Sequence, residues 1–305
     1  MKALFAKAAA RLFLACAILP LAAACMTVPG TGRSQLNFVN QAALNQEAAA
    51  AYREITAPGK LSTNRRDAEL IKKVGARIAR ASELLLAEYG QADEIAGFNW
   101  EFNLIESDDV NAFCLPGGKV AFYTGIMGIC HDEEGIATVM GHEVAHVIAQ
   151  HGAERASQGQ MAQIGGFILG TALGGGGMSS TTADLVMQAY GLGAQIGVLL
   201  PFSRAHESEA DRIGLSLMAL AGYDPDKAIQ FWDRMSADSG GSNDALNFLS
   251  THPTDSQRIK NITAYIPEAK TRAETNHIAP VKENQLVTTP AKADPAKGAR
   301  DGSSS

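Results

Sequence analysis

The chain has 305 residues, 46% of them hydrophobic, which suffices for one large domain or two modest ones. It carries 26 basic and 32 acidic residues, a formal net charge of −6 at pH 7. This balance argues against a nucleic-acid partner, which would require a concentrated basic surface.

Residues 1–24 have the organisation of an export signal. Lys2, Lys7 and Arg11 precede an apolar run over 12–24, which is too short to cross a bilayer as an ordinary transmembrane helix. A basic start, a short apolar core and small residues before a cleavage point are typical of a signal peptide, and a membrane-anchor helix is the alternative. Removal of the signal leaves 23 basic and 32 acidic residues, a net charge of −9.

The signal ends in Ala22-Ala23-Ala24-Cys25, which resembles a bacterial lipobox. In that motif the cysteine is lipidated and becomes the first residue of the mature chain, so Cys25 is the expected lipidation site. Ala22 stands where the motif usually has leucine, and ordinary signal-peptidase cleavage is the alternative. Met26 after the cysteine favours the outer membrane under Gram-negative sorting rules. We therefore expect a lipoprotein on the periplasmic face of the outer membrane, or alternatively a soluble periplasmic protein.

The first half of the mature chain alternates helical and strand patterns. Residues 25–60 are expected to be a tether leading into a first helix, and the apolar spacing over 65–89 predicts an amphipathic helix. Residues 98–105 alternate apolar and polar side chains, as a half-buried strand does. Residues 111–124 contain two strand-like pieces around a Pro-Gly-Gly sequence, which predicts a hairpin or bulge.

Two cysteines, Cys114 and Cys130, remain after the signal and the lipid site. An oxidising periplasm permits a disulfide between them, but the sequence does not decide whether their α-carbons come close enough.

Residues 142–146 read His-Glu-Val-Ala-His, the most informative pattern in the chain. Two histidines four residues apart project from one face of an α-helix, so their rings can bind one metal ion. Glu143 projects to the side, where it can reach a water on that metal without being a ligand. The acidic start and apolar spacing of residues 133–151 predict the helix, and we expect a packing or access reason for Gly135 and Gly141 within it. The alternative is a buried helix whose histidines only form hydrogen bonds.

The second half is less regular. Residues 161–202 are rich in glycine and apolar residues, and each apolar piece is too short to cross a bilayer. A helical pair with a mobile glycine linker is expected there, and a membrane- or substrate-facing flap is the alternative. Residues 203–221 predict a second amphipathic helix, and Asp224-Pro225 predicts the start of a third. The composition beyond residue 267 predicts disorder. The expected division is a signal peptide, a lipid-anchored tether, a folded domain that carries the candidate metal site and a disordered tail over residues 1–24, 25–60, 61–267 and 268–305.

A catalytic zinc site uses three protein ligands and one open position for water. The extended metzincin pattern requires a histidine at position 152, where this chain has glycine, so that class is excluded. A later helix offers Glu207 as the third ligand, and Asp211 on the same face can hold a ligating imidazole through its other nitrogen. Glu209 and His206 are rival ligands roughly 200° and 100° around that helix, so at most one of the three points at the metal.

The pattern H-E-x-x-H followed by S-R-x-x-E-x-x-A-D resembles the gluzincin zinc metallopeptidases of the HtpX and CAAX-prenyl-protease type, and most of all their periplasmic lipoprotein branch (BepA- and LoiP-like). Further motifs that resemble the family follow in order: Asn111-Ala112-Phe113, Pro116-Gly117-Gly118, Thr251-His252-Pro253 and Arg258-Ile259. The likeness covers roughly residues 61–267. The chain lacks the helical-repeat region of BepA and the clear membrane-spanning helices of HtpX. The resemblance implies an α+β, mainly helical, zincin-like fold with a small β-sheet beside the HExxH helix.

The same resemblance implies one Zn²⁺ per chain, with His142, His146 and Glu207 as ligands and Glu143 as the catalytic base. The strand that includes Asn111, Ala112 and Phe113 is expected to bind the substrate as an additional antiparallel strand.

His252 precedes a proline and is therefore expected on a loop. The resemblance places this loop over the cleft, where the imidazole either plugs the zinc or donates to the oxyanion of the reaction. We favour the plug, and an ordinary loop histidine is the alternative.

The sequence thus predicts a zinc-dependent endopeptidase of the bacterial cell envelope, which uses a zinc-activated water on unfolded or misassembled periplasmic and outer-membrane proteins. The expected partners are these protein substrates, the outer membrane through the lipid anchor and, as a candidate, outer-membrane assembly machinery. A chaperone-like assembly lipoprotein with a non-catalytic zinc site is the alternative, although Glu143 argues against it. A prenyl-protein protease is disfavoured by the missing membrane helices.

Overall fold

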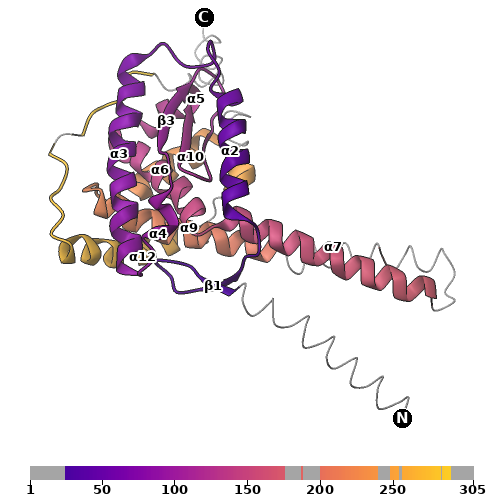
Figure 1. Cartoon of the computed structure of the whole chain (residues 1–305). Helices are drawn as coiled ribbons and strands as arrows, with labels where there is room; N and C mark the ends of the chain where they lie inside the picture. Colours follow the sequence, from indigo (N-terminus) through magenta and orange to yellow (C-terminus); the bar gives the residue numbers. More distant parts are fainter. Residues whose placement is uncertain are drawn as a thin grey trace, which may run out of the picture. The chain divides into compact units, whose positions relative to one another are not determined.

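The computed structural model describes residues 25–175, 187, 200–239, 248–253, 256–282 and 284–289 (Figure 1). The expected signal peptide, most of the glycine-rich linker and the last 16 residues lie outside the described residues. The chain divides into two compact units. Unit 1 comprises Met1–Val28, Gly32–Gln41 and Gln150–Ser203, and unit 2 comprises Pro29–Thr31, Ala42–Ala149 and Arg204–Ser305.

Unit 2 is built on a three-stranded sheet with the order β3-β5-β4. Strand β5 (Lys119–Tyr123) lies parallel to β3 (Glu101–Ile105) and antiparallel to β4 (Ala112–Leu115). The predicted hairpin joins β4 to β5, and its turn needs Gly117 and Gly118, whose φ angles of 81° and 80° are strained for other residues. Strand β4 therefore forms one edge of this sheet.

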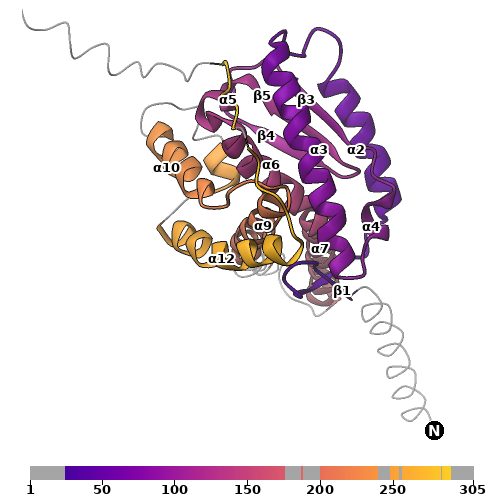
Figure 2. The same cartoon turned by 90° about the vertical axis from the view of Figure 1, so that its left-hand side faces the viewer.

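Helices cover both faces of the sheet, as Figures 1 and 2 show for α2 and α3. Helix α2 (Gln41–Ile55) contributes Tyr52, which is buried in a cluster with Ile105 and Ala121 and donates a hydrogen bond to the Val120 carbonyl. Helix α3 (Arg65–Glu88) packs on the other face and against α6 (Glu133–Ile148). At Gly75 of α3, a Cβ atom would lie 2.3 Å from the Phe102 ring, so helix and strand approach closely.

Unit 2 contains further helices in its described residues. They are α4 (Asp93–Ala96), α5 (Thr124–Cys130), α9 (Leu200–Leu220), α10 (Lys227–Ser239) and α12 (Ser256–Thr275). Helix α10 contacts α5, α6 and α12, and its Phe231 and Trp232 are fully buried. The α+β, mainly helical fold expected from the sequence is confirmed. Cys114 and Cys130 are free thiols, so the disulfide left open by the sequence is not formed.

The expected disorder from residue 268 is wrong for residues 268–282 and 284–289. Helix α12 continues through Pro267 to Thr275, and the following segment folds back onto unit 2. There the Thr288 and Thr289 amides each donate to the Asp67 carboxylate at 2.8 Å. These contacts could not be predicted from a composition rich in threonine and lysine. A hydrogen bond from a main-chain amide to a polar side chain leaves no periodic pattern in the sequence.

Unit 1 contains the paired strands β1 (Cys25–Thr27) and β2 (Ser34–Leu36) and the helix α7 (His151–Gly175). The expected tether over 25–60 is therefore structured, as strands here and as α2 in unit 2. The expected helix over 133–151 is interrupted at Gln150, whose φ of 54° separates α6 from α7. No helix in the described part of the chain combines the length and hydropathy required to cross a bilayer.

Candidate metal centre

The site forms where α6 crosses α9 within unit 2. A Cβ atom at Gly141 of α6 would lie 2.9 Å from the Gly214 carbonyl oxygen of α9, and one at Gly214 would lie 3.0 Å from the His142 amide nitrogen. Larger residues at either position would push the helices apart. At Gly135, a Cβ atom would overlap the Cys130 carbonyl. Packing is thus the reason for both glycines in the HExxH helix.

This crossing brings His142, His146 and Glu207 together, although Glu207 is far away in sequence. The Nε2 atoms of the two histidines lie 3.1 Å apart, and each lies 3.3 Å from a carboxylate oxygen of Glu207. Ligand atoms around a tetrahedral zinc with bonds of about 2.0–2.1 Å are roughly 3.3 Å apart. Both the donor types and their spacing therefore fit a zinc ion.

The charges of these groups are strongly coupled. Burial lowers the pKa of His142, but hydrogen bonds with Asp211 and Glu207 outweigh this and raise its pKa to about 9. Burial raises the pKa of Glu207, but hydrogen bonds from His142, His146 and His252 lower it well below its usual range. Without a metal, the carboxylates thus hold a proton on His142, and binding of a cation displaces it.

Asp211 and Arg258 hold His142 from behind. Asp211 Oδ1 lies 2.9 Å from His142 Nδ1, and Arg258 donates to both Asp211 oxygens at 2.8 Å. The Arg258 guanidinium also lies 3.6 Å from the Trp232 ring centre and donates to the main-chain carbonyls of His252 and the next residue, each at 3.1 Å. In the sequence, Arg258 stands out only as part of a motif, and Trp232 was not among the predicted site residues. The signal that could have pointed to Arg258 is its position, six residues after the candidate ligand His252.

The rival ligands on α9 point elsewhere. Glu209 accepts a hydrogen bond from the Thr31 hydroxyl and is absent from the cluster of candidate metal ligands among the described residues. His206 is fully buried and likewise outside that cluster. The geometry therefore selects Glu207 among the three.

His252 reaches the same cluster from a different direction. It follows a helical turn over 248–251, and its amide donates to the Phe248 carbonyl at 2.9 Å. Its Nδ1 lies 3.1 Å from His142 Nε2 and 3.0 Å from Glu207 Oε2. One donor atom from each of His142, His146, Glu207 and His252 falls within 4.8 Å of the others, so the imidazole of His252 could supply a fourth ligand atom to the candidate metal site.

Glu143 lies beside this cluster but outside it. Its side chain is buried, and its Oε1 lies 3.5 Å from His252 Nε2 while accepting no hydrogen bond from the described residues. Burial raises the pKa of Glu143. A buried carboxylate oxygen without a donor marks a place for an external hydrogen-bond donor, such as a water.

The expected substrate strand borders the same region. Asn111 precedes β4, and Ala112 and Phe113 begin it. Phe113 packs toward α2, whereas Cys114 lies on the opposite face of the strand and senses the Glu143 charge, because burial and Glu143 both raise the pKa of its thiol. The edge strand thus runs past Glu143.

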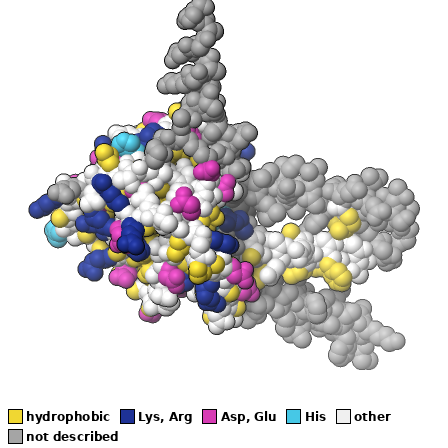
Figure 3. All heavy atoms as spheres, turned by 90° about the horizontal axis from the view of Figure 1, so that it is seen from above, with side chains coloured by type: hydrophobic (Ala, Val, Ile, Leu, Met, Phe, Trp, Pro, Cys, Tyr) yellow, Lys and Arg dark blue, Asp and Glu magenta, His cyan; other side chains and the backbone are white. Residues whose placement is uncertain are grey.

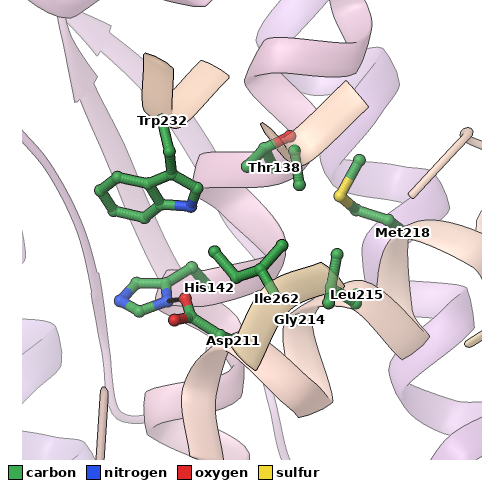
Figure 4. Close-up of a pocket in the computed structure, with 9 residues that line it drawn as sticks. Thr138, His142, Asp211, Gly214, Leu215, Met218, Trp232 and Ile262 are labelled. Carbon is green, nitrogen blue, oxygen red and sulfur yellow. Dashed lines mark ion pairs between the residues drawn. The ribbon is translucent and has the colours of Figure 1, made fainter. Parts of the chain in front are cut away.

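Behind the metal ligands lies a small cavity of about 10 Å³, roughly the space of one water (Figure 4). His142 and Asp211 form one wall, and Trp232, Leu215 and Ile262 are among the apolar residues that complete it. Its size excludes a substrate.

Comparison with known proteins agrees with this geometry. The family model "Peptidase family M48" matches residues 68–266. Mitochondrial metalloendopeptidase OMA1 of Schizosaccharomyces pombe is 38% identical over 199 residues, which cover 65% of this chain and 55% of that protein. OMA1 of Saccharomyces cerevisiae is 36% identical over 180 residues, covering 57% of this chain and 49% of that protein. The beta-barrel assembly-enhancing protease of Escherichia coli is 28% identical over 167 residues, which cover 52% of this chain and 33% of that protein.

The matched part of the chain thus spans about half of the OMA1 proteins and a third of the E. coli protease. The mitochondrial relatives match at higher identity than the E. coli protease, so the comparisons do not single out the periplasmic lipoprotein branch. The M48 metallopeptidases use zinc, and the cluster that contains the two histidines and the glutamate described above could hold such an ion. The chain therefore belongs to peptidase family M48, a family of zinc metallopeptidases.

Proposed function

We propose that this protein is a zinc-dependent endopeptidase of the bacterial cell envelope, and that it degrades unfolded or misassembled periplasmic and outer-membrane proteins. One observation carries the proposal: the buried Glu143 carboxylate lies beside the ligand cluster without belonging to it. A purely structural zinc site has no use for such a group.

His142, His146 and Glu207 are the proposed ligands, and Asp211 orients His142. When bound, zinc polarises the substrate carbonyl and lowers the pKa of a water. Glu143 is the proposed base: burial raises its pKa, so it accepts a proton more readily, and it can then pass that proton to the leaving amine.

The edge strand β4 is the proposed substrate platform. A polypeptide that pairs with it would extend the sheet through main-chain hydrogen bonds, which are independent of most side chains. Asn111, Ala112 and Phe113 would then lie along the bound chain. This mode of binding favours broad sequence preference and extended, unfolded substrates.

His252 is proposed to restrain the enzyme. Its imidazole occupies the fourth position around the ligand cluster, where a water is required for hydrolysis. The loop must move before a substrate is cleaved. An oxyanion role after such a movement is the competing possibility for this residue.

The envelope location rests on residues 1–25 and on the likeness to the E. coli protease. Acyl chains on Cys25 would attach the protein to the outer membrane, and a soluble periplasmic form is the alternative. The name of the E. coli relative makes outer-membrane assembly machinery a candidate partner. No nucleic-acid partner is proposed, because the chain is acidic.

The four-donor cluster favours a second candidate, a chaperone-like assembly lipoprotein whose zinc is structural. Casein digestion by the mature protein (residues 25–305), with and without a chelator, separates the two. We expect chelator-sensitive cleavage that is absent in Glu143→Gln and increased in His252→Ala. If neither the wild type nor His252→Ala cleaves casein while both bind zinc and suppress aggregation of an unfolded protein, the chaperone-like function is correct.

A further inference from the structure

Helix α7 of unit 1 exposes large apolar side chains along one side. Met161, Ile164, Phe167 and Ile168 are 37%, 52%, 76% and 62% exposed, respectively. At 100° per residue, these four positions fall within a sector of roughly 120° around the helix. Exposed apolar groups gathered on one helix face indicate a binding surface rather than scattered surface hydrophobics.

The same part of α7 carries no charge. Arg155 is the last charged residue of the helix, and the described residues 156–175 contain none. Figure 3 shows the surface along α7 in the colours of hydrophobic and uncharged groups. A surface without charges lacks the ion pairs that set partner choice in most protein interfaces, and it enters the polar–apolar boundary of a bilayer at low cost.

Unit 1 also holds Cys25, the proposed lipidation site, in a fixed relation to α7. Strand β1 begins at Cys25 and pairs with β2, with Cys25 opposite Leu36. The β1–β2 hairpin is in turn attached to the first turns of α7, because Arg33 makes a two-bond ion pair with Glu154 at 2.9 and 2.7 Å. The Phe38 amide adds a hydrogen bond to the Ser157 hydroxyl. No flexible tether therefore separates the anchor position from the helix.

We propose that the apolar face of α7, formed by Met161, Ile164, Phe167 and Ile168, lies on the lipid surface that the acyl chains of Cys25 enter. This proposal rests on the proposed lipidation only for its cellular setting, because the α7 face itself can be tested without the acyl chains. Insertion of α7 alone is weak, since its polar side lacks the basic residues that attract anionic headgroups. Attachment of the chain to the membrane at Cys25 makes the insertion of α7 intramolecular. The acyl chains and the apolar face of α7, each of which binds a bilayer weakly, then together give a stable association with the membrane.

Vesicle flotation of the mature Cys25→Ser protein tests the face directly. The probe is a vesicle of phosphatidylcholine, with a second set that contains anionic phosphatidylglycerol. We expect binding to both vesicle types that changes less than about twofold between low and high salt, because the face is uncharged. Phe167→Ser/Ile168→Ser should lower the partition coefficient at least about tenfold. The matched control Leu286→Ser, which changes an exposed leucine of unit 2, should leave partitioning unchanged.

Unchanged zinc content and casein cleavage in Phe167→Ser/Ile168→Ser show that unit 2 is folded, and an unchanged far-ultraviolet circular dichroism spectrum shows that the helix α7 is retained. If the partition coefficient of the Cys25→Ser protein is no higher than that of its variant with the two added serines, the proposal is wrong. If the serines instead dissolve a dimer seen by sedimentation without lipid, a second copy of the chain occupies the face. If wild-type Cys25 carries no lipid while the Cys25→Ser protein floats, the proposed lipidation is wrong and the proposal for the apolar face of α7 stands.

Discussion

Replacement of Asp211 by asparagine should weaken zinc binding while sparing all three proposed ligands. Asp211 Oδ1 lies 2.9 Å from His142 Nδ1, and the same carboxylate receives two hydrogen bonds of 2.8 Å from Arg258. Asparagine preserves the shape of the Asp211 side chain but loses its negative charge. Its NH₂ group would also face a hydrogen-bond donor where the carboxylate offers an acceptor. Loss of such an outer partner lowers metal affinity about 10–100-fold, which corresponds to about 1.4–2.7 kcal/mol.

Stability should fall as well, because Arg258 remains buried without a full counter-ion, at a cost of up to about 3 kcal/mol. Zinc competition against a fluorescent chelator at pH 7 measures the affinity, and urea unfolding measures the stability. Asp233→Asn, on an exposed position of α10, is the matched control. The double variant Asp211→Asn/Arg258→Met should recover part of the stability but not the zinc affinity. A zinc affinity of Asp211→Asn within twofold of the wild type would refute the role assigned to this carboxylate.

Four further outcomes are expected. Glu143→Gln should keep about one zinc per chain by metal analysis but lose casein hydrolysis at least about 10²-fold, and loss of zinc would contradict its place outside the ligand set. Glu207→Ala should lose zinc whereas Glu209→Ala keeps it, and the reverse result would overturn the choice of ligand. His252→Ala should raise casein hydrolysis if the imidazole plugs the site and lower it about 10²-fold if it stabilises the oxyanion, so an unchanged rate and zinc affinity remove both ideas. Burial raises the pKa of Glu134 to about 7, so the stability of the protein should fall as the pH rises from about 4.5 through 7, and Glu134→Gln should abolish that fall in urea unfolding.

The centre of the domain was accessible from the sequence because its signals are periodic or local. The four-residue spacing of His142 and His146 fixes their common helix face in any fold that keeps the helix. The Pro-Gly-Gly sequence specifies the turn at Gly117 and Gly118, and thereby the antiparallel pair that places β4 at the sheet edge. Such features need no knowledge of the rest of the chain.

Other parts depend on long-range contacts that leave no local trace. The pairing of Gly141 with Gly214 decides how closely α6 and α9 cross, yet either glycine alone suggests only a weak point in a helix. Arg258 stands out in the sequence only as part of a motif, and its burial against Trp232 and Asp211 is seen only in the fold. The composition of residues 284–289 predicts disorder. The segment is ordered by contacts with Asp67, which lies more than 200 positions earlier and therefore leaves no local signal.

The return of this late segment to the HExxH helix determines when activity can arise. The amide of Glu133, the first residue of α6, donates to the Gln285 carbonyl at 3.0 Å, and the Val287 amide donates to the His131 carbonyl at the same distance. A growing chain that stops before residue 285 leaves the start of this helix without those bonds and must still close a loop of about 150 residues. Proteolytic competence is therefore expected only after residue 287 has been synthesised. Under the proposed export, a chain that is held unfolded until it has crossed the membrane gains its activity at its destination.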